Sequence, residues 1–495
     1  MTEIECIGVV GAGAMGAGIA QVSLAAGLRV ILFDQQAGAV DRASTSILDR
    51  LRSEAAKGRL AAEVAASAEG RLTKASALSD LRPAQLVVEA IVERLDAKQA
   101  LLTELEGIVA PDCVLASNTS SLPIAAIARP CARPERVCGM HFFNPVPLMR
   151  LVEIVRGPAT GADTVAVARR LGERLGKVAI DVVDAPGFLV NLGGRAYVTE
   201  ALHLLQEGAA DIATIDAIMR DACGFRMGPF ELMDLTGIDV NLPVTKLIVD
   251  GYQGEPRLRT TYLHQLMLDA GTLGRKTGKG FYDYPAVGSS KQAEPAARPA
   301  LRSVPFAADD RLGAVLGEAL RANGLASATG SDRPILVEPF GEDAATFAVR
   351  EGLDPRRVVA LDATGFGRNA LTVMAPIGAG EACREVASWL ESVGYRVHLI
   401  ADTPGFVAQR ILAMIANLGC EIAQMSLATP DDIDRAMELG LNYPAGPLAI
   451  GDRMGLVTVH RILTNLQAIT GSDRYRPSLW LRQRALLGLP AKTPR

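Results

Sequence analysis

The stretch Ile7-Gly8-Val9-Val10-Gly11-Ala12-Gly13-Ala14-Met15-Gly16 decides the fold at the start of this chain. Its first four residues predict a short buried strand, and the residues up to about Ala26 predict a small, apolar helix. A glycine-rich turn between such a strand and helix is the G-x-G-x-x-G pattern of dinucleotide-binding domains. Gly11 allows the tight turn, Gly13 lets a pyrophosphate approach the helix N-terminus, and Gly16 lets the helix pack closely on the strand.

The next predicted strand, Arg29 to Phe33, ends on Asp34, which indicates the kind of dinucleotide. A carboxylate at this position can accept hydrogen bonds from both ribose hydroxyls of NAD, and it would repel the 2′-phosphate of NADP. We therefore predict an NAD site. Its members are Gly11, Ala12, Gly13, Ala14, Met15, Gly16 and Asp34.

Further strand patterns follow at residues 86–90, 114–118, 137–143 and 151–155, and helical patterns separate most of them. This alternation predicts a mostly parallel, doubly wound α/β sheet of the Rossmann type over residues 1–183. Ser120 and His141 fall at or just beyond the carboxyl ends of predicted strands. Because ligands bind at that edge of such sheets, we predict the active site there.

His141 stands in Met140-His141-Phe142-Phe143-Asn144-Pro145 with three polar residues at fixed distances. Ser120 precedes it by 21 residues, Glu153 follows it by 12, and Asn191 closes the stretch Pro186-Gly187-Phe188-Leu189-Val190-Asn191. A carboxylate that orients an imidazole makes it a better proton acceptor near neutral pH. A histidine beside two phenylalanines is, by itself, more often a packed core residue, so His141 alone does not decide between the two interpretations.

These motifs together resemble the L-3-hydroxyacyl-CoA dehydrogenase family, and the resemblance runs from residue 4 to about 285. The motifs that carry it are Gly-Ala-Gly-Ala-Met-Gly at 11–16, Asn-Thr-Ser-Ser at 118–121, His-Phe-Phe-Asn-Pro at 141–145, Leu-Val-Glu-Ile at 151–154 and Pro-Gly-Phe-Leu-Val-Asn at 186–191. The resemblance implies that His141 is the catalytic base and Glu153 its partner carboxylate. It implies that Ser120 and Asn191 face the substrate.

The same resemblance implies further ligand contacts. It assigns Glu93, Lys98, Asn144 and Lys276 to the cofactor site. Lys57 matches a lysine that meets the CoA phosphates, whereas Arg50, assigned to the same group, stands where the family often has a serine. Both residues lie in a predicted helical stretch from about Ala37 to Ala66.

The second half of the chain repeats part of the first. A helical pattern is expected over 184–285, followed by a linker at 286–305 that is rich in Ala, Pro and Ser. At a constant shift of 218 residues, Pro404-Gly405-Phe406 mirrors Pro186-Gly187-Phe188, and Gly446-Pro447 mirrors Gly228-Pro229. We therefore predict a second helical domain over 401–495.

The stretch between the two helical domains, residues 306–400, alternates strands with helices but lacks a G-x-G-x-x-G start. At the same shift Leu371 replaces Glu153 and Gln409 replaces Asn191. We interpret this stretch as a degenerate Rossmann-like domain that cannot bind a dinucleotide. In short members of the family the helical domain forms the dimer interface. A duplicated copy would cover that interface as an internal pseudo-dimer, and a further homodimer stays open.

The long form resembles the bacterial branch of the family that acts on 3-hydroxybutyryl-CoA or 3-hydroxyadipyl-CoA, in fatty acid or phenylacetate degradation. The resemblance implies NAD-dependent oxidation of a (3S)-3-hydroxyacyl-CoA to a 3-ketoacyl-CoA. Two alternatives are a dehydrogenase of hydroxy acids without CoA and a non-catalytic, NAD-binding structural protein. An intact set of Ser120, His141, Glu153 and Asn191 counts against the structural protein, which would need none of these residues.

The composition of the chain argues against several classes of binding partner. A net charge of −4 over 495 residues gives no global attraction to nucleic acid or to an anionic membrane. Seven cysteines without a C-x-x-C pair support neither a zinc site nor a disulfide framework, so no metal is expected. With no leader pattern and no apolar run long enough to span a membrane, we expect a cytoplasmic protein.

Overall fold

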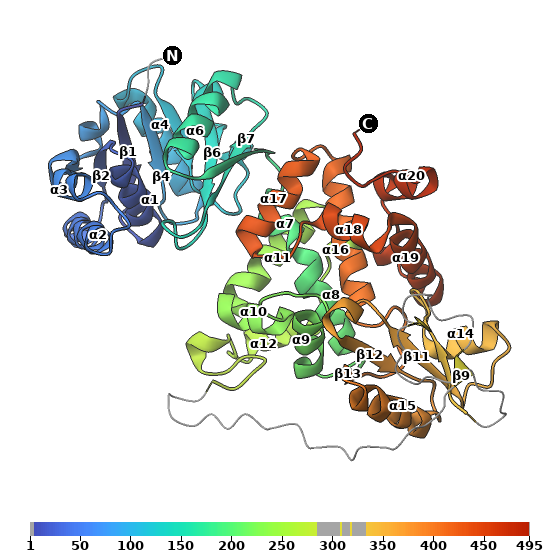
Figure 1. The fold of residues 1–495 in the computed structure, drawn as a ribbon. Helices are drawn as coiled ribbons and strands as arrows, with labels where there is room; N and C mark the ends of the chain where they lie inside the picture. The colour runs from blue at the N-terminus through green and yellow to red at the C-terminus, as the bar shows by residue number, and fades with distance from the viewer. Residues whose placement is uncertain (1–3, 285–306, 309–316, 319–332, 495) are drawn as a thin grey trace. The chain divides into compact units, whose positions relative to one another are not determined.

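The computed structural model describes residues 4–284, 307–308, 317–318 and 333–494 (Figure 1). The predicted linker at 286–305 lies outside the described residues. The chain divides into two compact units. The first contains residues 1–192 together with 425–441, and the second contains residues 193–424 together with 442–495.

The first unit is built on an eight-stranded sheet in the order β3-β2-β1-β4-β5-β6-β7-β8. Neighbouring strands run parallel except β6 and β7, which are antiparallel, so the predicted mostly parallel Rossmann sheet is confirmed. The strands are β1 (Cys6–Val10), β2 (Arg29–Phe33), β3 (Leu72–Lys74), β4 (Leu86–Glu89), β5 (Val114–Ser117), β6 (Val137–Phe142), β7 (Leu151–Arg156) and β8 (Val178–Val183).

Helices connect these strands and bury the apolar strand residues against the sheet. They are α1 (Ala14–Ala25), α2 (Ala39–Ala56), α3 (Ala62–Arg71), α4 (Leu95–Ile108), α5 (Ile124–Ala128), α6 (Ala162–Arg174), α7 (Val190–Gly193) and, from far along the chain, α17 (Pro430–Leu441). Short 3₁₀ turns are η1 (Leu78–Leu81) and η2 (Pro134–Arg136).

The helical stretch predicted from Ala37 to Ala66 is in fact two helices, which corrects the sequence analysis. Helix α2 ends at Ala56, and Gly58 adopts a left-handed φ of +69°. The N–H groups of Gly58 and Arg59 donate to the carbonyls of Ala55 and Glu54, which closes the helix end as a Schellman motif. The helical pattern of the sequence runs across this break, which is why periodicity alone did not reveal it.

The second unit combines helices with a five-stranded sheet in the order β13-β12-β11-β10-β9. Its strands are β9 (Ala307–Ala308), β10 (Ile335–Val337), β11 (Val358–Asp362), β12 (Ala370–Met374) and β13 (Arg396–Leu399). Its helices are α8 (Arg195–Gln206), α9 (Ile212–Asp221), α10 (Pro229–Thr236), α11 (Ile238–Gly251), α12 (Tyr262–Asp269), α14 (Ala344–Arg350), α15 (Gly380–Ser392), α16 (Ala408–Gln424), α18 (Pro447–Met454), α19 (Leu456–Thr470) and α20 (Leu479–Leu487). The 3₁₀ turns are η3 (Pro256–Leu258), η4 (Arg275–Thr277), η5 (Phe366–Arg368) and η6 (Asp473–Tyr475).

The internal repeat is visible in equivalent local structures. Helices α10 and α18 each begin at a Pro that follows a capping Gly, and Gly228 and Gly446 have nearly the same φ and ψ, −68° and 163° against −67° and 161°. Strands β11 and β12 form the antiparallel pair of the small sheet, as β6 and β7 do in the large one. Proline in the first helical turn explains why both copies keep it.

The two helical copies exchange one helix, which the sequence analysis did not predict. Helix α17 belongs to the second copy by sequence, yet it packs on β7 and β8 of the first sheet. In the second unit, α9 of the first copy packs on β12 and β13. Equivalent backbone hydrogen bonds accompany the two exchanged helices. The N–H of Val183 donates to the carbonyl of Leu427 at 2.9 Å, and the N–H of Ala401 donates to the carbonyl of Ala209 at 2.9 Å. No helix among the described residues is long and apolar enough to cross a membrane.

Candidate active site

His141 and Glu153 lie directly opposite each other on the antiparallel strands β6 and β7. Residues at such positions point to the same face of a sheet, so their side chains meet. The imidazole Nδ1 lies 2.5 Å from Glu153 Oε2. His141 is only 5% exposed and Glu153 is fully buried, so the pair is shielded from water. The predicted pairing of the two residues is present in the geometry.

The second carboxylate oxygen of Glu153 is held by the backbone. Its Oε1 accepts from the N–H of Leu189 at 3.1 Å and of Val190 at 2.9 Å. The imidazole itself is packed by two aromatic rings, with centroids 4.5 Å away for Phe143 and 5.8 Å for Phe188. Within the Pro-Gly-Phe-Leu-Val-Asn motif, Leu189 and Val190 therefore act on the pair through their backbone N–H groups, and Phe188 acts through its ring.

Ser120 sits in a loop after β5 that is fixed by Glu93. Glu93 Oε1 accepts from the hydroxyl of Thr119 at 2.7 Å, and from the N–H of Ser120 at 3.0 Å and of Ser121 at 3.2 Å. Burial alone would raise the pKa of Glu93, but the Thr119 hydroxyl and the Lys98 ammonium outweigh it, and the pKa lies below its ordinary value. Glu93 is thus an ionised clamp on the Ser120 loop.

Lys98 is buried at the base of this clamp and is 1% exposed. Its ammonium lies 2.9 Å from both carboxylate oxygens of Glu89 and 3.3 Å from Glu93 Oε2. The Ser117 hydroxyl donates to Glu89 as well. Sequence reasoning missed Glu89 and Thr119; an acid as the last residue of β4, the strand beside β1, was the available signal for Glu89.

Asn191 joins the Ser120 loop to the residues that hold Glu153. Its side-chain amide donates to the backbone carbonyl of Ser120 at 3.2 Å. On the other side of the loop, Asn118 Oδ1 accepts from the N–H of Phe142, next to His141, at 2.9 Å. The structure therefore brings Ser120, His141, Glu153 and Asn191 into one connected group within the first unit.

The glycine-rich turn has the shape that a bound dinucleotide requires. Gly11 has a φ of +103°, and a Cβ there would lie 2.5 Å from the carbonyl oxygen of Ala90. A Cβ on Gly16 would lie 1.8 Å from the carbonyl oxygen of Gly11, whereas the space beside Gly13 is open. An adjoining cavity of about 580 Å³ is lined by residues that include Gly11, Gly13 and Asp34. The residues present therefore fit an adenine dinucleotide.

Asp34 stands at the end of β2 as predicted, and the backbone fixes its carboxylate. Oδ2 accepts from the N–H of Ala12 at 2.7 Å, and Oδ1 accepts from the N–H of Gln36 at 2.8 Å. Ala14 and Met15 begin helix α1, for which Gly13 is the capping residue. The carboxylate is thus locked against the glycine-rich turn, where it faces the side of the cavity expected for a ribose.

The remaining predicted ligand residues lie further out. Asn144 is exposed in the loop after β6. Arg50 is exposed on α2, and Lys57 is exposed directly after the end of that helix. The Lys57 ammonium lies 3.6 Å from the Glu54 carboxylate, and Arg50 lines a shallow groove together with residues that include Ser46 and Ser53. Lys276 belongs to the second unit, on η4, where its ammonium pairs with Asp239.

Comparison with known proteins identifies the family. The model for the NAD binding domain of 3-hydroxyacyl-CoA dehydrogenase matches residues 6–185, and the model for the C-terminal domain of the same enzymes matches residues 187–284 and again 405–495. The chain belongs to the 3-hydroxyacyl-CoA dehydrogenase family. The double match confirms the predicted duplication of the helical domain, and the first match confirms NAD as the cofactor.

Individual members of the family match over different lengths. The chain is 39% identical to the 3-hydroxyadipyl-CoA dehydrogenase of Escherichia coli, over 98% of each chain. It is 39% identical to a probable 3-hydroxybutyryl-CoA dehydrogenase of Bacillus subtilis, over 57% of this chain and 98% of the relative. The crystal structure of 3-hydroxybutyryl-CoA dehydrogenase from Escherichia coli superposes with a TM-score of 0.87 at 38% identity, covering 98% of this chain and 99% of that one. The long form is therefore shared with these Escherichia coli proteins, and the chain is an NAD-dependent dehydrogenase.

Proposed function

We propose that this enzyme oxidises a (3S)-3-hydroxyacyl-CoA to the 3-ketoacyl-CoA, with His141 as the general base. The buried contact between His141 Nδ1 and Glu153 Oε2, at 2.5 Å, carries the proposal. With Nδ1 donating to the carboxylate, Nε2 is the nitrogen that accepts the proton of the substrate 3-hydroxyl. Glu153 fixes this tautomer and stabilises the imidazolium that forms, as a carboxylate does in other acid–base pairs.

The backbone bonds to Glu153 Oε1 support this role, because they keep the carboxylate in place while the imidazole changes charge. Leu189 and Val190 donate to one oxygen, and His141 occupies the other. In a water-poor site the attraction between carboxylate and imidazolium is stronger than at the surface. General base catalysis of this kind contributes about 10² to 10⁴ in rate.

Ser120 and Asn191 are assigned to the substrate. The Ser120 hydroxyl hydrogen-bonds the reacting oxygen, and Asn191 positions the substrate near His141. The Glu93 clamp and the bond from Asn191 to the Ser120 carbonyl, at 3.2 Å, support a loop that is ordered before substrate arrives. Pre-ordered polar groups reduce the reorganisation that catalysis would otherwise require.

NAD, when bound, accepts the hydride from C3 of the substrate. Residues 11–16 and Asp34 would hold its adenosine and pyrophosphate, and Glu93 and Asn144 would contact it further along. Lys276 is assigned to the cofactor by the family resemblance alone. Lys98 is proposed to act through Glu93, since its ammonium is buried against that carboxylate and Glu89. Lys57 and Arg50, both exposed and cationic, are assigned to the CoA phosphates.

The acyl group is proposed to be either the short-chain 3-hydroxybutyryl or 3-hydroxyadipyl, in fatty acid or phenylacetate degradation. The full-length relative of Escherichia coli named for 3-hydroxyadipyl-CoA supports the second, and the superposed structure named for 3-hydroxybutyryl-CoA supports the first. Comparing kcat/KM for the two CoA esters decides between them. Activity on free 3-hydroxybutyrate at the rate of its CoA ester would instead favour a hydroxy acid dehydrogenase.

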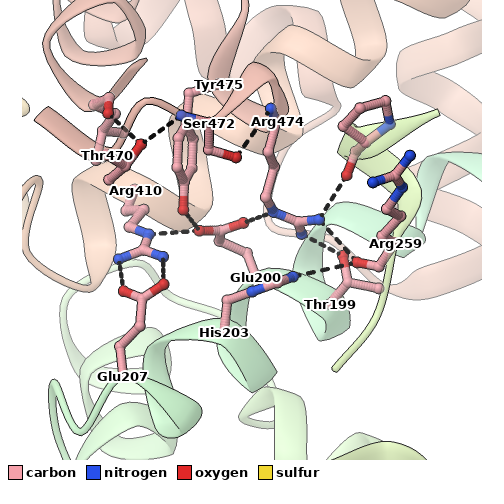
Figure 2. Close-up of polar contacts among 12 residues, drawn as sticks. Thr199, Glu200, His203, Glu207, Arg259, Arg410, Thr470, Ser472, Arg474 and Tyr475 are labelled. Atoms are coloured by element: carbon pink, nitrogen blue, oxygen red, sulfur yellow. Dashed lines mark hydrogen bonds and ion pairs between the residues drawn. The ribbon is translucent and has the colours of Figure 1, made fainter. Parts of the chain in front are cut away.

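The two helical copies are proposed to form an internal pseudo-dimer. Helix α8 of the first copy packs along α16 of the second, which is buried over almost its whole length. Figure 2 shows the Glu200 carboxylate of α8 between the guanidinium groups of Arg410 and Arg474, both from the second copy. The Arg410 and Arg474 Nε atoms lie 2.5 Å and 2.6 Å from Glu200 oxygens, and the Tyr475 hydroxyl donates to the same carboxylate at 2.9 Å.

This cluster of Glu200, Arg410, Arg474, Tyr475 and Glu207 supports a permanent contact. Glu200 and Arg410 are both fully buried, so a small displacement of one copy against the other would leave each charge without its partner and still without water. Glu207 completes the pairing with two bonds to Arg410, at 2.6 Å and 2.7 Å. Buried charges are retained only where their partners are in place, which favours an obligate interface.

A cytoplasmic location is also proposed for this enzyme, and it agrees with seven cysteines that are all free thiols.

A further inference from the structure

Helix α17, which the second helical copy contributes to the first unit, packs beside the catalytic strand β7. Its buried residues Ile433, Ala436 and Met437 recur at helical spacing and form one face of the helix, which Gly440 continues toward the C-terminal end. The loop before the helix is tied to the sheet edge through the bond from Val183 N–H to the Leu427 carbonyl, at 2.9 Å. The helix is therefore anchored to the sheet at its start and along one face.

Gly440 lies close to two neighbours of the catalytic residues, Val190 and Leu151. A Cβ at Gly440 would lie 3.0 Å from Val190 Cγ1 and 3.1 Å from Leu151 Cδ2. The N–H of Val190 donates to Glu153 Oε1, and Leu151 lies on the same strand as Glu153, two residues before it. Gly440 is helical and has no left-handed φ, so the glycine provides space rather than an unusual backbone conformation.

From this we propose that Gly440 is a positioning residue of the dehydrogenase site, through which the second half of the chain sets the alignment of Glu153 with His141. The inference rests on the proposed function of that pair. An added Cβ at 440 would press on the side-chain ends of Val190 and Leu151, which would have to give way by a few tenths of an ångström, and a larger side chain would demand more. Where the Val190 backbone follows its side chain, the N–H donor to Glu153 moves and the carboxylate shifts against the imidazole.

A close approach of the same kind occurs in the second unit, where the end of helix α9 meets the small sheet domain. Position 222, which is 218 residues before 440, is Ala222 and directly follows helix α9. There the space is provided from the other side, since a Cβ on Gly365 would lie 2.6 Å from the Ala222 Cβ. In the first unit the residues beside the helix end are Val190 and Leu151, and the residue without a side chain is on the helix, at Gly440.

The test uses the full chain with Gly440→Val and Gly440→Ala, and with Arg435→Leu on the exposed face of the same helix as a matched control. We expect Gly440→Val to lower kcat with acetoacetyl-CoA and NADH by about 10-fold or more, because small misplacements of catalytic groups are costly. Gly440→Ala should act in the same direction but less, and Arg435→Leu should have no effect. The Kd for NADH should be unchanged in all three variants.

A spectroscopic measurement separates positioning from general destabilisation. The proton between His141 Nδ1 and Glu153 should give a far-downfield ¹H NMR resonance, identified by its loss in His141→Gln, since short charge-assisted hydrogen bonds deshield their proton. It should move upfield in Gly440→Val and return in the double variant Val190→Ala/Gly440→Val, which makes room for the added methyl groups. This readout needs no turnover, so it stands even if acetoacetyl-CoA proves not to be a substrate. An unchanged resonance and unchanged kcat in folded Gly440→Val, or no recovery in the double variant, would overturn the inference.

Discussion

The side chains of His141 and Glu153 face each other across the one antiparallel strand pair of the large sheet, with Nδ1 2.5 Å from Oε2. This pairing follows from strand register, and it does not depend on a flexible loop. A slip of one residue between β6 and β7 would turn one of the two side chains to the opposite face. The remainder of the site is attached to this pair through the backbone of Leu189 and Val190.

Replacing Glu153 by Gln should lower kcat by about 10² to 10⁴ while leaving NAD binding intact. The amide keeps the size of the side chain but removes the charge that stabilises the imidazolium, and it puts an N–H group near the N–H groups of Leu189 and Val190 or of the imidazole. Steady-state kinetics with a 3-hydroxyacyl-CoA, together with a direct titration of NAD, measure the two effects. Turnover close to that of the wild type would show that His141 works without this partner.

NAD should be used at least about 100-fold better than NADP, measured as kcat/KM. The Asp34 carboxylate is locked by the N–H groups of Ala12 and Gln36, at 2.7 Å and 2.8 Å, so it cannot swing away from a 2′-phosphate. A like-charge contact of about 3 kcal/mol corresponds to that ratio. Asp34→Asn should reduce the preference, since the amide removes the charge. Equal use of both cofactors by the wild type would contradict the assignment of Asp34.

Titration calorimetry should give one NAD per chain. The small sheet has its antiparallel pair β11 and β12, but the sequence of residues 306–400 has no G-x-G-x-x-G turn, and Leu371 stands at the position that corresponds to Glu153. Without the glycines, a pyrophosphate cannot approach the backbone at a helix N-terminus. Two equivalents per chain, with the second retained when Asp34 is replaced, would mean that the second sheet domain binds a nucleotide after all.

Replacing Glu200 by Gln should lower the free energy of unfolding by about 3 to 5 kcal/mol, because it leaves the buried Arg410 and Arg474 without their shared carboxylate. Glu207→Gln is the comparison variant: Glu207 is 40% exposed and pairs with Arg410 alone, so its loss should cost less than the loss of Glu200. Denaturant titration followed by tryptophan fluorescence measures both. A Glu200 variant as stable as the wild type would show that the cluster does not hold the two copies together.

The same cluster has a defined dependence on pH. Burial alone would raise the pKa of Glu200, but Arg474 and Arg410 outweigh it and hold the pKa well below its ordinary value. A lowered pKa in the folded state means that the contribution is fully present above the unfolded-state pKa, about 4, and is lost as the pH falls below it. The stability difference between wild type and Glu200→Gln should therefore be constant from about pH 6 to pH 8 and shrink below about pH 4.

The features best predicted from the sequence are those whose geometry is set by residues adjacent in the chain. The glycine-rich turn and Asp34 follow from a strand, a turn and a helix that are adjacent in the chain, and the structure has all three in place. His141 and Glu153 were paired by their spacing and by the family resemblance, and the register of β6 and β7 accounts for that spacing. The duplication was visible because one shift of 218 residues aligns it.

What the sequence did not reveal depends on contacts between distant segments. The clamp of Glu93 on Thr119 and Ser121 joins two loops that periodicity cannot relate. The sequence does not show that the two copies exchange helices, so α17 could not be placed on the first sheet. The apolar pattern of α17 is the same whether the helix packs on its own sheet domain or on the other one. The break at Gly58 was missed because the helical pattern continues across a single left-handed residue.

The absorbance of NADH, followed after acetoacetyl-CoA is added to the purified full chain, shows whether the enzyme acts on a CoA ester with His141 as its base. The wild type and His141→Gln are compared side by side. We predict that the wild type consumes NADH and that His141→Gln binds NADH normally but turns over about 10² to 10⁴ times more slowly. Free acetoacetate serves as the control for the need for CoA. No NADH consumption by the wild type, or undiminished consumption by His141→Gln, would contradict the account.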